Sequence, residues 1–184
     1  MHAPALAAAD PTTTPPRETQ ETIMAWKRAT FGPSTPLRTL AGATEELSEL
    51  FRKITSDAPP AAVVEEAADV ALLLCDIGEW LGASDWLFGV REPRLYRPVR
   101  LTGYALTQIG LLVFDVELIV DGDPSRSQSI ALRNLRAVLG ALRELSSIYG
   151  QDLRSAIDAK MAINRTRKWE LDGTGHGYHR GAAR

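Results

Sequence analysis

The sequence predicts an all-α fold, a bundle of about five helices in a single domain. Apolar residues recur at helical spacing over most of the chain, and proline or glycine interrupts this recurrence between segments. The chain has 184 residues, of which 45% are hydrophobic and 24% are charged, an ordinary balance for one globular domain with its own core. The expected loops are short, as in helical bundles.

The N-terminal part of the chain predicts a tail, a short amphipathic segment and a first long helix. Residues 1–20 consist mainly of alanine, threonine and proline, a composition typical of disorder. Residues 21–30 are amphipathic and stop at a Phe-Gly-Pro sequence. Over residues 36–55, large apolar residues recur at helical spacing until a pair of prolines ends the pattern.

The middle of the chain predicts one buried helix and one segment whose conformation stays open. Residues 61–82 predict a helix whose centre, from Val70 to Leu74, is apolar on all sides and is therefore expected to be buried. Residues 89–100 contain two prolines and four arginines and predict an exposed connection. Residues 101–120 fit a helix, but two glycines and many β-branched residues leave a strand as the alternative.

The C-terminal part predicts two further helices, at about residues 126–149 and 151–169, with Gly150 between them. Residues 171–184 are glycine-rich and predict a flexible tail. The expected organisation is therefore an N-terminal tail, one helical domain over residues 21–170, and a C-terminal tail.

The charge and the apolar runs bear on partners and location. The formal net charge is -2, so no basic field favours a nucleic-acid polymer or an anionic membrane. The longest uninterrupted apolar runs, near residues 70–74 and 109–114, are shorter than a membrane span, and no signal peptide is recognised. We therefore expect a cytoplasmic protein without a membrane partner. The single cysteine, Cys75, lies in an apolar run and predicts a buried thiol.

Two pairs of acidic residues lie at helical spacing in successive predicted helices. Glu46 and Glu49 are three residues apart in the first, and Glu66 and Asp69 are three apart in the second, so each pair shares a helix face. If the pairs face each other, their mutual repulsion calls for a compensating charge. Carboxylates without sulfur or imidazole ligands suit Mg²⁺, with Mn²⁺ as a substitute. From spacing alone, a solvated helix face with intrahelical ion pairs is an equal alternative.

The sequence argues against a di-iron carboxylate bundle, because such a bundle needs histidines on the helices and the three histidines of the chain lie in the predicted tails. Other polar residues accompany the acids: Lys53 projects from the side of the first pair, and Asp76 continues the face of the second. Lys160, Asn164 and Arg167 can share one face of the last helix, where a solvated basic helix end is the alternative.

The acidic pattern resembles the signature of the MazG-like, all-α nucleoside triphosphate pyrophosphohydrolases. The matching acids are Glu45, Glu46 and Glu49, followed by Glu66 and Asp69. A wider match is similar to a MazG-related subgroup whose members are often phage proteins acting on purine deoxynucleotides. It consists of Trp26, residues 29–33, residues 68–76, Lys160, Asn164 and residues 167–169.

The resemblance implies an enzyme that cleaves a nucleoside triphosphate between its α and β phosphates, yielding a monophosphate and pyrophosphate. It implies metal ligation by the four acids at positions 46, 49, 66 and 69, with Glu46 or Glu49 as the general base. It also implies a homodimer or a dimer of dimers, in the host cytoplasm if a phage encodes the chain. Guanine or adenine nucleotides (dGTP, GTP or dATP) are the expected substrates.

The resemblance also gives roles to residues outside the acids. Lys53, Lys160 and Arg167 are expected to contact phosphate oxygens, with Asn164 as a hydrogen-bond partner. Trp26 is a candidate for stacking on the base, with core packing as the alternative. Asp76 is expected to reach a metal, the ribose or the base, or to support the metal ligands.

Two other functions remain open at this point. The chain could be a pyrophosphatase of the same family directed at dUTP or dCTP, or a non-catalytic helical module that binds nucleotide or another protein. Nucleotide turnover separates the enzymes from the module.

Overall fold

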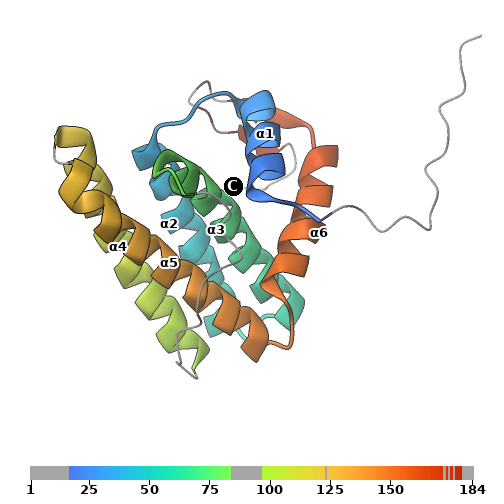
Figure 1. Cartoon of the computed structure of the whole chain (residues 1–184). Helices are drawn as coiled ribbons and strands as arrows, with labels where there is room; N and C mark the ends of the chain where they lie inside the picture. The colour runs from blue at the N-terminus through green and yellow to red at the C-terminus, as the bar shows by residue number, and fades with distance from the viewer. Residues whose placement is uncertain are drawn as a thin grey trace, which may run out of the picture.

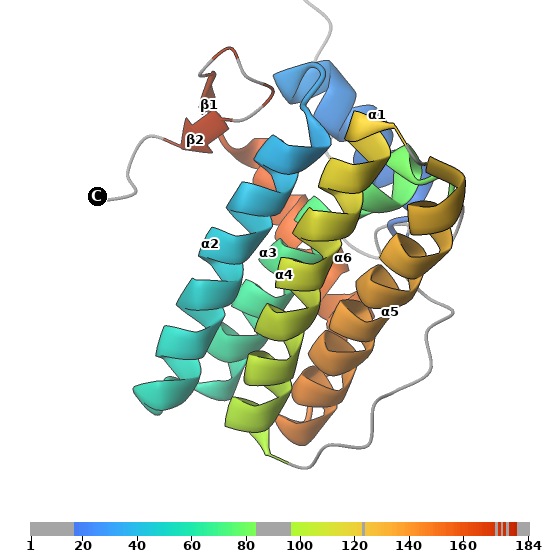
Figure 2. The same cartoon turned by 90° about the vertical axis from the view of Figure 1, so that its left-hand side faces the viewer.

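In the part of the chain that it describes, the computed structural model has six α-helices (Figure 1) and one ribbon of two short strands (Figure 2). It describes residues 17–83, 97–122, 124–171, 173, 175 and 177–179, with the backbone alone for residues 124–127, 178 and 179. The elements are α1 (Gln20–Phe31), α2 (Pro36–Thr55), α3 (Pro60–Trp80), α4 (Pro98–Asp121), α5 (Pro124–Ile148), α6 (Leu153–Thr166), β1 (Trp169–Leu171) and β2 (Gly177–His179). The predicted all-helical bundle is confirmed, with six helices in the described part because the amphipathic segment before Gly32 is a helix of its own.

Helix α3 lies at the centre of the bundle. It packs against α1, α2, α5 and α6, while α4 packs against α2 and α5. Helices α2 to α5 run side by side along most of their lengths (Figure 2). The residues of α3 from Val70 to Leu74 are buried apart from Leu73, which is partly buried against the core. The all-apolar centre of this helix therefore serves as the core, as its sequence predicts.

The cysteine of α3 is part of this core. Cys75 is fully buried, and its thiol donates a hydrogen bond to the carbonyl oxygen of Ala71 at 3.5 Å. Burial raises the pKa of the thiol well above its usual range. The predicted buried thiol is confirmed.

Residues 101–120, for which the sequence allows either a helix or a strand, are helical and belong to α4. Leu101, Ala105, Ile109, Leu112 and Val116 recur every three or four residues, and each is at most 1% exposed. Burial of this single stripe against α2 and α5 decides for the helix, because tertiary packing outweighs the β-propensity of the segment.

One buried polar pair joins α4 to α5. The side-chain amide of Asn134 donates a hydrogen bond of 2.7 Å to Asp115, and both side chains are buried.

On the other side of α4, Leu111, Phe114 and Leu118 are exposed. By length and composition, α4 could also cross a membrane, and 28% of its most apolar window is buried. One such helix is weak evidence for a membrane span, because core helices of soluble proteins meet the same criterion. Counting uninterrupted apolar runs misses this helix because polar residues and glycines divide it.

The C-terminal part departs from its predicted conformation. Helix α6 ends at Thr166, three residues before the predicted end at 169, because Arg167 adopts an extended conformation with φ -70° and ψ 146°. Strands β1 and β2 then pair antiparallel, with Trp169 opposite His179. Part of the predicted flexible tail is thus a strand. Its backbone hydrogen bonds join β1 to β2, and the sequence of either segment alone does not predict this pairing.

The N-terminal tail is anchored where the structure describes it, and its residues 1–16 lie outside the described part. The carboxylate of Glu18 accepts hydrogen bonds of 2.9 and 3.0 Å from the guanidinium of Arg165. The backbone amide of Glu18 donates to Asp158 at 2.9 Å. Both partners belong to α6, so the chain before α1 is tied to the last helix. Of the predicted connection 89–100, only residues 97–100 are described, and Pro98 begins α4.

Candidate metal and nucleotide site

Three acidic side chains converge between α2 and α3. Carboxylate oxygens of Glu46, Glu66 and Asp69 all lie within 4.8 Å of one another. Glu46 projects from α2, and the spacing of three residues places Glu66 and Asp69 on the face of α3 that meets α2. Three of the four predicted metal ligands are therefore brought together by the packing of two neighbouring helices.

The fourth predicted ligand, Glu49, lies at the edge of this group. Its side chain is 50% exposed and pairs with Arg52 on the same helix, with 3.0 Å between the nitrogen and the oxygen. Its negative charge still raises the pKa values of Glu46 and Glu66, so it is close enough to act on both electrostatically.

The acids of the group resist ionisation. Burial raises the pKa of Glu46 to about 7, with the charges of Asp69, Glu66 and Glu49 adding to the effect of burial. Burial also raises the pKa values of Glu66 and Asp69, and for Glu66 the charge of Asp69 acts in the same direction. Burial, joined by neighbouring negative charges at Glu46 and Glu66, therefore disfavours the ionised forms of these acids.

Two lysines supply positive charge to this group of acids. The ammonium nitrogen of Lys160, on α6, lies 2.5 Å from Oδ2 of Asp69 and 2.8 Å from Oε1 of Glu65. Burial lowers the pKa of Lys160, but the charges and hydrogen bonds of these two carboxylates reverse the effect, and its pKa is raised. Lys53 of α2 lies 3.8 Å from Glu66, at the outer limit of an ion pair.

The donor set fits a hard divalent cation. Oxygen ligands without sulfur or imidazole are those that Mg²⁺ and Mn²⁺ prefer. The three carboxylates lie close enough together to share one ion, whose charge would oppose the burial and the repulsion that together raise the pKa of Glu46. Glu46, Glu66 and Asp69 are the residues that would hold it.

A cavity lined by aromatic residues adjoins the acids. It has a volume of about 130 Å³, and its lining includes Glu46 and Asp69 themselves. Trp26 and Phe31 of α1 and Trp169 of β1 form one part of the lining. Their rings meet edge to face, with centroids 5.0 to 6.1 Å apart. The lining of this cavity therefore combines aromatic side chains with two of the three converging carboxylates.

The polar face predicted on the last helix also reaches this region. Lys160 and Asn164 are buried, and Asn164 lines the aromatic cavity. The guanidinium of Arg167 donates a hydrogen bond of 3.2 Å to the side chain of Asn164 and lies 5.9 Å from the ring centre of Trp169. The three predicted residues of α6 and its end are therefore brought to the acids and the cavity, although Arg167 itself lies beyond the helix.

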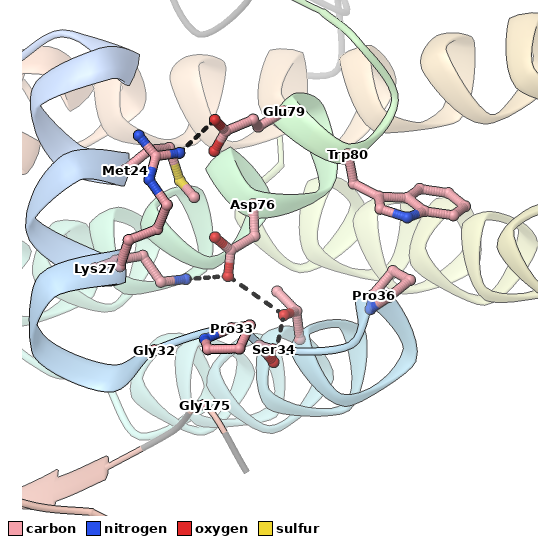
Figure 3. A pocket seen from close by; sticks show the side chains of 12 residues that line it. Met24, Lys27, Gly32, Pro33, Ser34, Pro36, Asp76, Glu79, Trp80 and Gly175 are labelled. Carbon is pink, nitrogen blue, oxygen red and sulfur yellow. Dashed lines mark hydrogen bonds and ion pairs between the residues drawn. The ribbon is translucent and has the colours of Figure 1, made fainter. Parts of the chain in front are cut away.

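Asp76 faces a different pocket, with a volume of about 250 Å³ (Figure 3). Its carboxylate accepts hydrogen bonds from Lys27 of α1 and from Thr39 of α2, the latter at 3.3 Å. Trp80 lies at another part of the same pocket and is 41% exposed. Asp76 therefore joins α1 and α2 to α3 and is absent from the lining of the aromatic cavity, although Lys27 lines both hollows.

Several residues of the site carry no prediction of a role from the sequence. Glu65 reaches Lys160 only because α6 crosses α3, and Trp169 reaches the cavity only because the chain turns into β1. The tight approach of Gly177 to Phe31 likewise depends on pairing of the two strands: a Cβ at Gly177 would lie 2.8 Å from the ring of Phe31. Of these residues, only Trp169 has a signal in the sequence, because it ends the basic run of residues 167–169 that belongs to the wider resemblance.

No family model, curated protein or solved structure matches this chain. The interpretation of the site therefore depends on its own geometry.

Proposed function

We propose that this protein is a pyrophosphohydrolase of nucleoside triphosphates that requires Mg²⁺, with Mn²⁺ as a substitute. One observation carries the proposal: three carboxylates converge, and two of them, Glu46 and Asp69, also line an aromatic cavity. Such a pair of features suits a substrate with a flat base at one end and phosphates at the other. It also agrees with the MazG-like pattern of acids, which motivates cleavage between the α and β phosphates.

The residues divide the work according to where they lie. The aromatic rings of Trp26, Phe31 and Trp169 offer faces and edges to the base, and Asn164 offers a hydrogen bond. Lys160 pairs with Asp69, and the charge of Arg167 also acts on Asp69, so both can supply positive charge to the phosphates. Lys53 is close enough to the acids to add to this charge.

A divalent cation held by Glu46, Glu66 and Asp69 would offset the charge of the phosphates and polarise the bond that breaks. With those three carboxylates committed to ligation, Glu49 is the acid left to accept a proton from the attacking water. Its exposed carboxylate lies next to the group and pairs at the surface with Arg52, which supports this role.

We further propose purine deoxynucleotides, dGTP or dATP, as substrates, and GTP as a second guanine substrate. This part of the proposal rests on the resemblance to the phage-type subgroup and not on a contact that selects a base. The alternatives are dUTP or dCTP, which the same panel of assays includes. Assembly as a homodimer or a dimer of dimers is likewise a proposal from the resemblance.

A panel of nucleotides tests the proposal. The protein is incubated with each nucleoside and deoxynucleoside triphosphate and Mg²⁺ at pH 8, and the products are separated by ion exchange. We expect pyrophosphate and a monophosphate from at least one purine nucleotide. Glu46→Gln is expected to lower this activity on the order of a hundredfold or more.

A matched control distinguishes the site from a loss of surface charge. Glu45→Gln removes the same charge from the neighbouring, exposed residue and should retain the activity. Inorganic phosphate in place of pyrophosphate would show that another bond is cut. Absence of turnover with every nucleotide, together with binding of one of them by calorimetry, would favour a nucleotide-binding module instead.

A further inference from the structure

The ammonium group of Lys160 already occupies part of the acidic site. It lies 2.5 Å from Oδ2 of Asp69, one of the three carboxylates that converge there, and the lysine side chain is only 8% exposed. A positive charge of the protein itself therefore contacts the carboxylate that a divalent cation would use.

The two positive charges compete. A cation held by Glu46, Glu66 and Asp69 would lie within a few ångströms of the Lys160 ammonium, and like charges repel strongly at such distances in a partly buried site. Asp69 cannot bind both at full strength. Entry of the cation is therefore expected to weaken the pair between Lys160 and Asp69.

A displaced Lys160 still needs a partner. A buried ammonium without a hydrogen-bond acceptor is costly, because it has lost its hydration. Glu65 provides the acceptor: its Oε1 lies 2.8 Å from the same nitrogen, and it is not among the three converging acids.

We propose that Lys160 is an internal counter-ion that a divalent cation displaces from Asp69, and that Glu65 is the positioning residue that keeps the displaced ammonium beside the site. The proposal rests on the cation site of the proposed function and not on the bond that is cleaved. Cation binding then frees N–H donors of Lys160 for an anionic group, so the cation prepares the site for phosphate.

The first test measures cation affinity by calorimetry with Mn²⁺ at pH 8, without nucleotide. Lys160→Met is expected to bind Mn²⁺ on the order of tenfold more tightly than the native protein, because the competing charge is gone. Lys168→Met removes the same charge from an exposed residue near the end of α6 and should change the affinity less than about twofold. Circular dichroism checks folding, and Lys160→Gln replaces the methionine variant if that variant does not fold.

The outcomes separate this inference from the proposed function. Tighter binding of Mn²⁺ by the Lys160 variant supports displacement of Lys160 by the cation. If the native protein binds Mn²⁺ and the Lys160 variant binds it equally or more weakly, displacement of Lys160 by the cation is overturned, whereas the cation site itself is supported. No binding by either protein overturns both.

A double-mutant cycle tests Glu65. Glu65→Gln is expected to weaken Mn²⁺ binding several-fold in the native background, because the displaced ammonium loses its acceptor. In the Lys160→Met background the same substitution should have little effect, since there is no ammonium to hold. An equal loss in both backgrounds would show that Glu65 acts only as one more negative charge, and would overturn its positioning role.

Discussion

The ring of Phe31 meets the indole of Trp169 edge to face, with the ring centroids 5.0 Å apart. Phe31 is the last residue of α1, and Trp169 is the first residue of β1. The contact therefore joins segments from the two ends of the chain beside the converging acids. The proposed base-binding cavity depends on this contact, since both rings line it.

The first prediction concerns the tight approach of β2 to α1. Gly177→Val would place a Cβ 2.8 Å from the Phe31 ring and 3.0 Å from the Glu170 carbonyl oxygen, so the ring or the strand must move. We expect the KM for the nucleotide to rise on the order of tenfold, with Mn²⁺ affinity unchanged. Steady-state kinetics and calorimetry measure the two quantities.

A glycine in open space provides the control. A Cβ at Gly103, within α4, would meet no atom within 4 Å, so Gly103→Ala should leave the KM unchanged and raise stability by about 0.5 to 1 kcal/mol. An unchanged KM in the Gly177 variant would show that the ribbon does not shape the nucleotide site.

The second prediction concerns the pH dependence of stability without cation. The pKa of Glu46 is about 7 in the folded protein and 4.5 as a free side chain, so between these values the folded state binds more protons than the unfolded state. Stability should therefore fall as pH rises from about 4.5 to 7. We expect Glu46 to account for about 2 kcal/mol of this fall, allowing for its partial exposure.

Urea unfolding at several pH values in the presence of EDTA measures this effect. Glu46→Gln should flatten the fall and be more stable than the native protein at pH 8. Parallel pH profiles for the two proteins would contradict the raised pKa, because the glutamine variant cannot titrate at this position.

The third prediction concerns cation binding and stability. Because the native state alone assembles the three carboxylates, Mg²⁺ or Mn²⁺ should stabilise it by about 2.7 kcal/mol at a hundredfold excess over Kd. Thermal unfolding should show a Tm that rises with cation concentration. Glu66→Gln should abolish most of this rise, whereas a rise of the same size in that variant would place the cation elsewhere.

The fourth prediction separates the proposed base from the cation ligands. Glu49→Gln should lower kcat by about a hundredfold or more, while Mn²⁺ affinity falls only a few-fold through the lost charge. Arg52→Gln breaks the same surface pair and should retain kcat. A loss of cation affinity in the Glu49 variant as large as that in Glu66→Gln would make Glu49 a ligand instead.

The fifth prediction concerns the pair that joins α4 to α5. Asn134→Ala removes the donor that lies 2.7 Å from the buried carboxylate of Asp115 and should destabilise the protein by about 2 to 3 kcal/mol. Thr107→Ala, on the exposed side of α4, should cost less than about 0.5 kcal/mol. Chemical denaturation compares the two variants, and equal stabilities would contradict the structural importance of the pair.

The helices could be predicted because their apolar residues face one core. Helix α2 begins at Pro36 and ends at Thr55, the bounds expected from the spacing of its leucines and the prolines that follow. The conformation of α4 could not be decided locally, because the same β-branched residues suit a strand. Its buried stripe gains its significance only from packing against α2 and α5.

Some features of the site are likewise indicated by local spacing, whereas others depend on how distant segments pack. The spacing of Glu46, Glu66 and Asp69 lets the acids of two adjacent helices meet, but from spacing alone a solvated helix face is an equal alternative. Packing of α2 against α3 decides for their meeting. Asp76 shares the spacing but lies two turns farther along α3, where Lys27 and Thr39 engage it in another pocket. The partnership of Glu65 with Lys160 depends on where α6 crosses α3, a relationship between distant segments that no local pattern contains.

The burial of Cys75 has a practical consequence for spectroscopy. The thiol is fully buried and its pKa is raised, so maleimide reagents should not modify it while the protein is folded. It is the only cysteine of the chain. One cysteine introduced at an exposed position, such as Lys168→Cys, would therefore accept a fluorophore or spin label selectively in the otherwise native sequence.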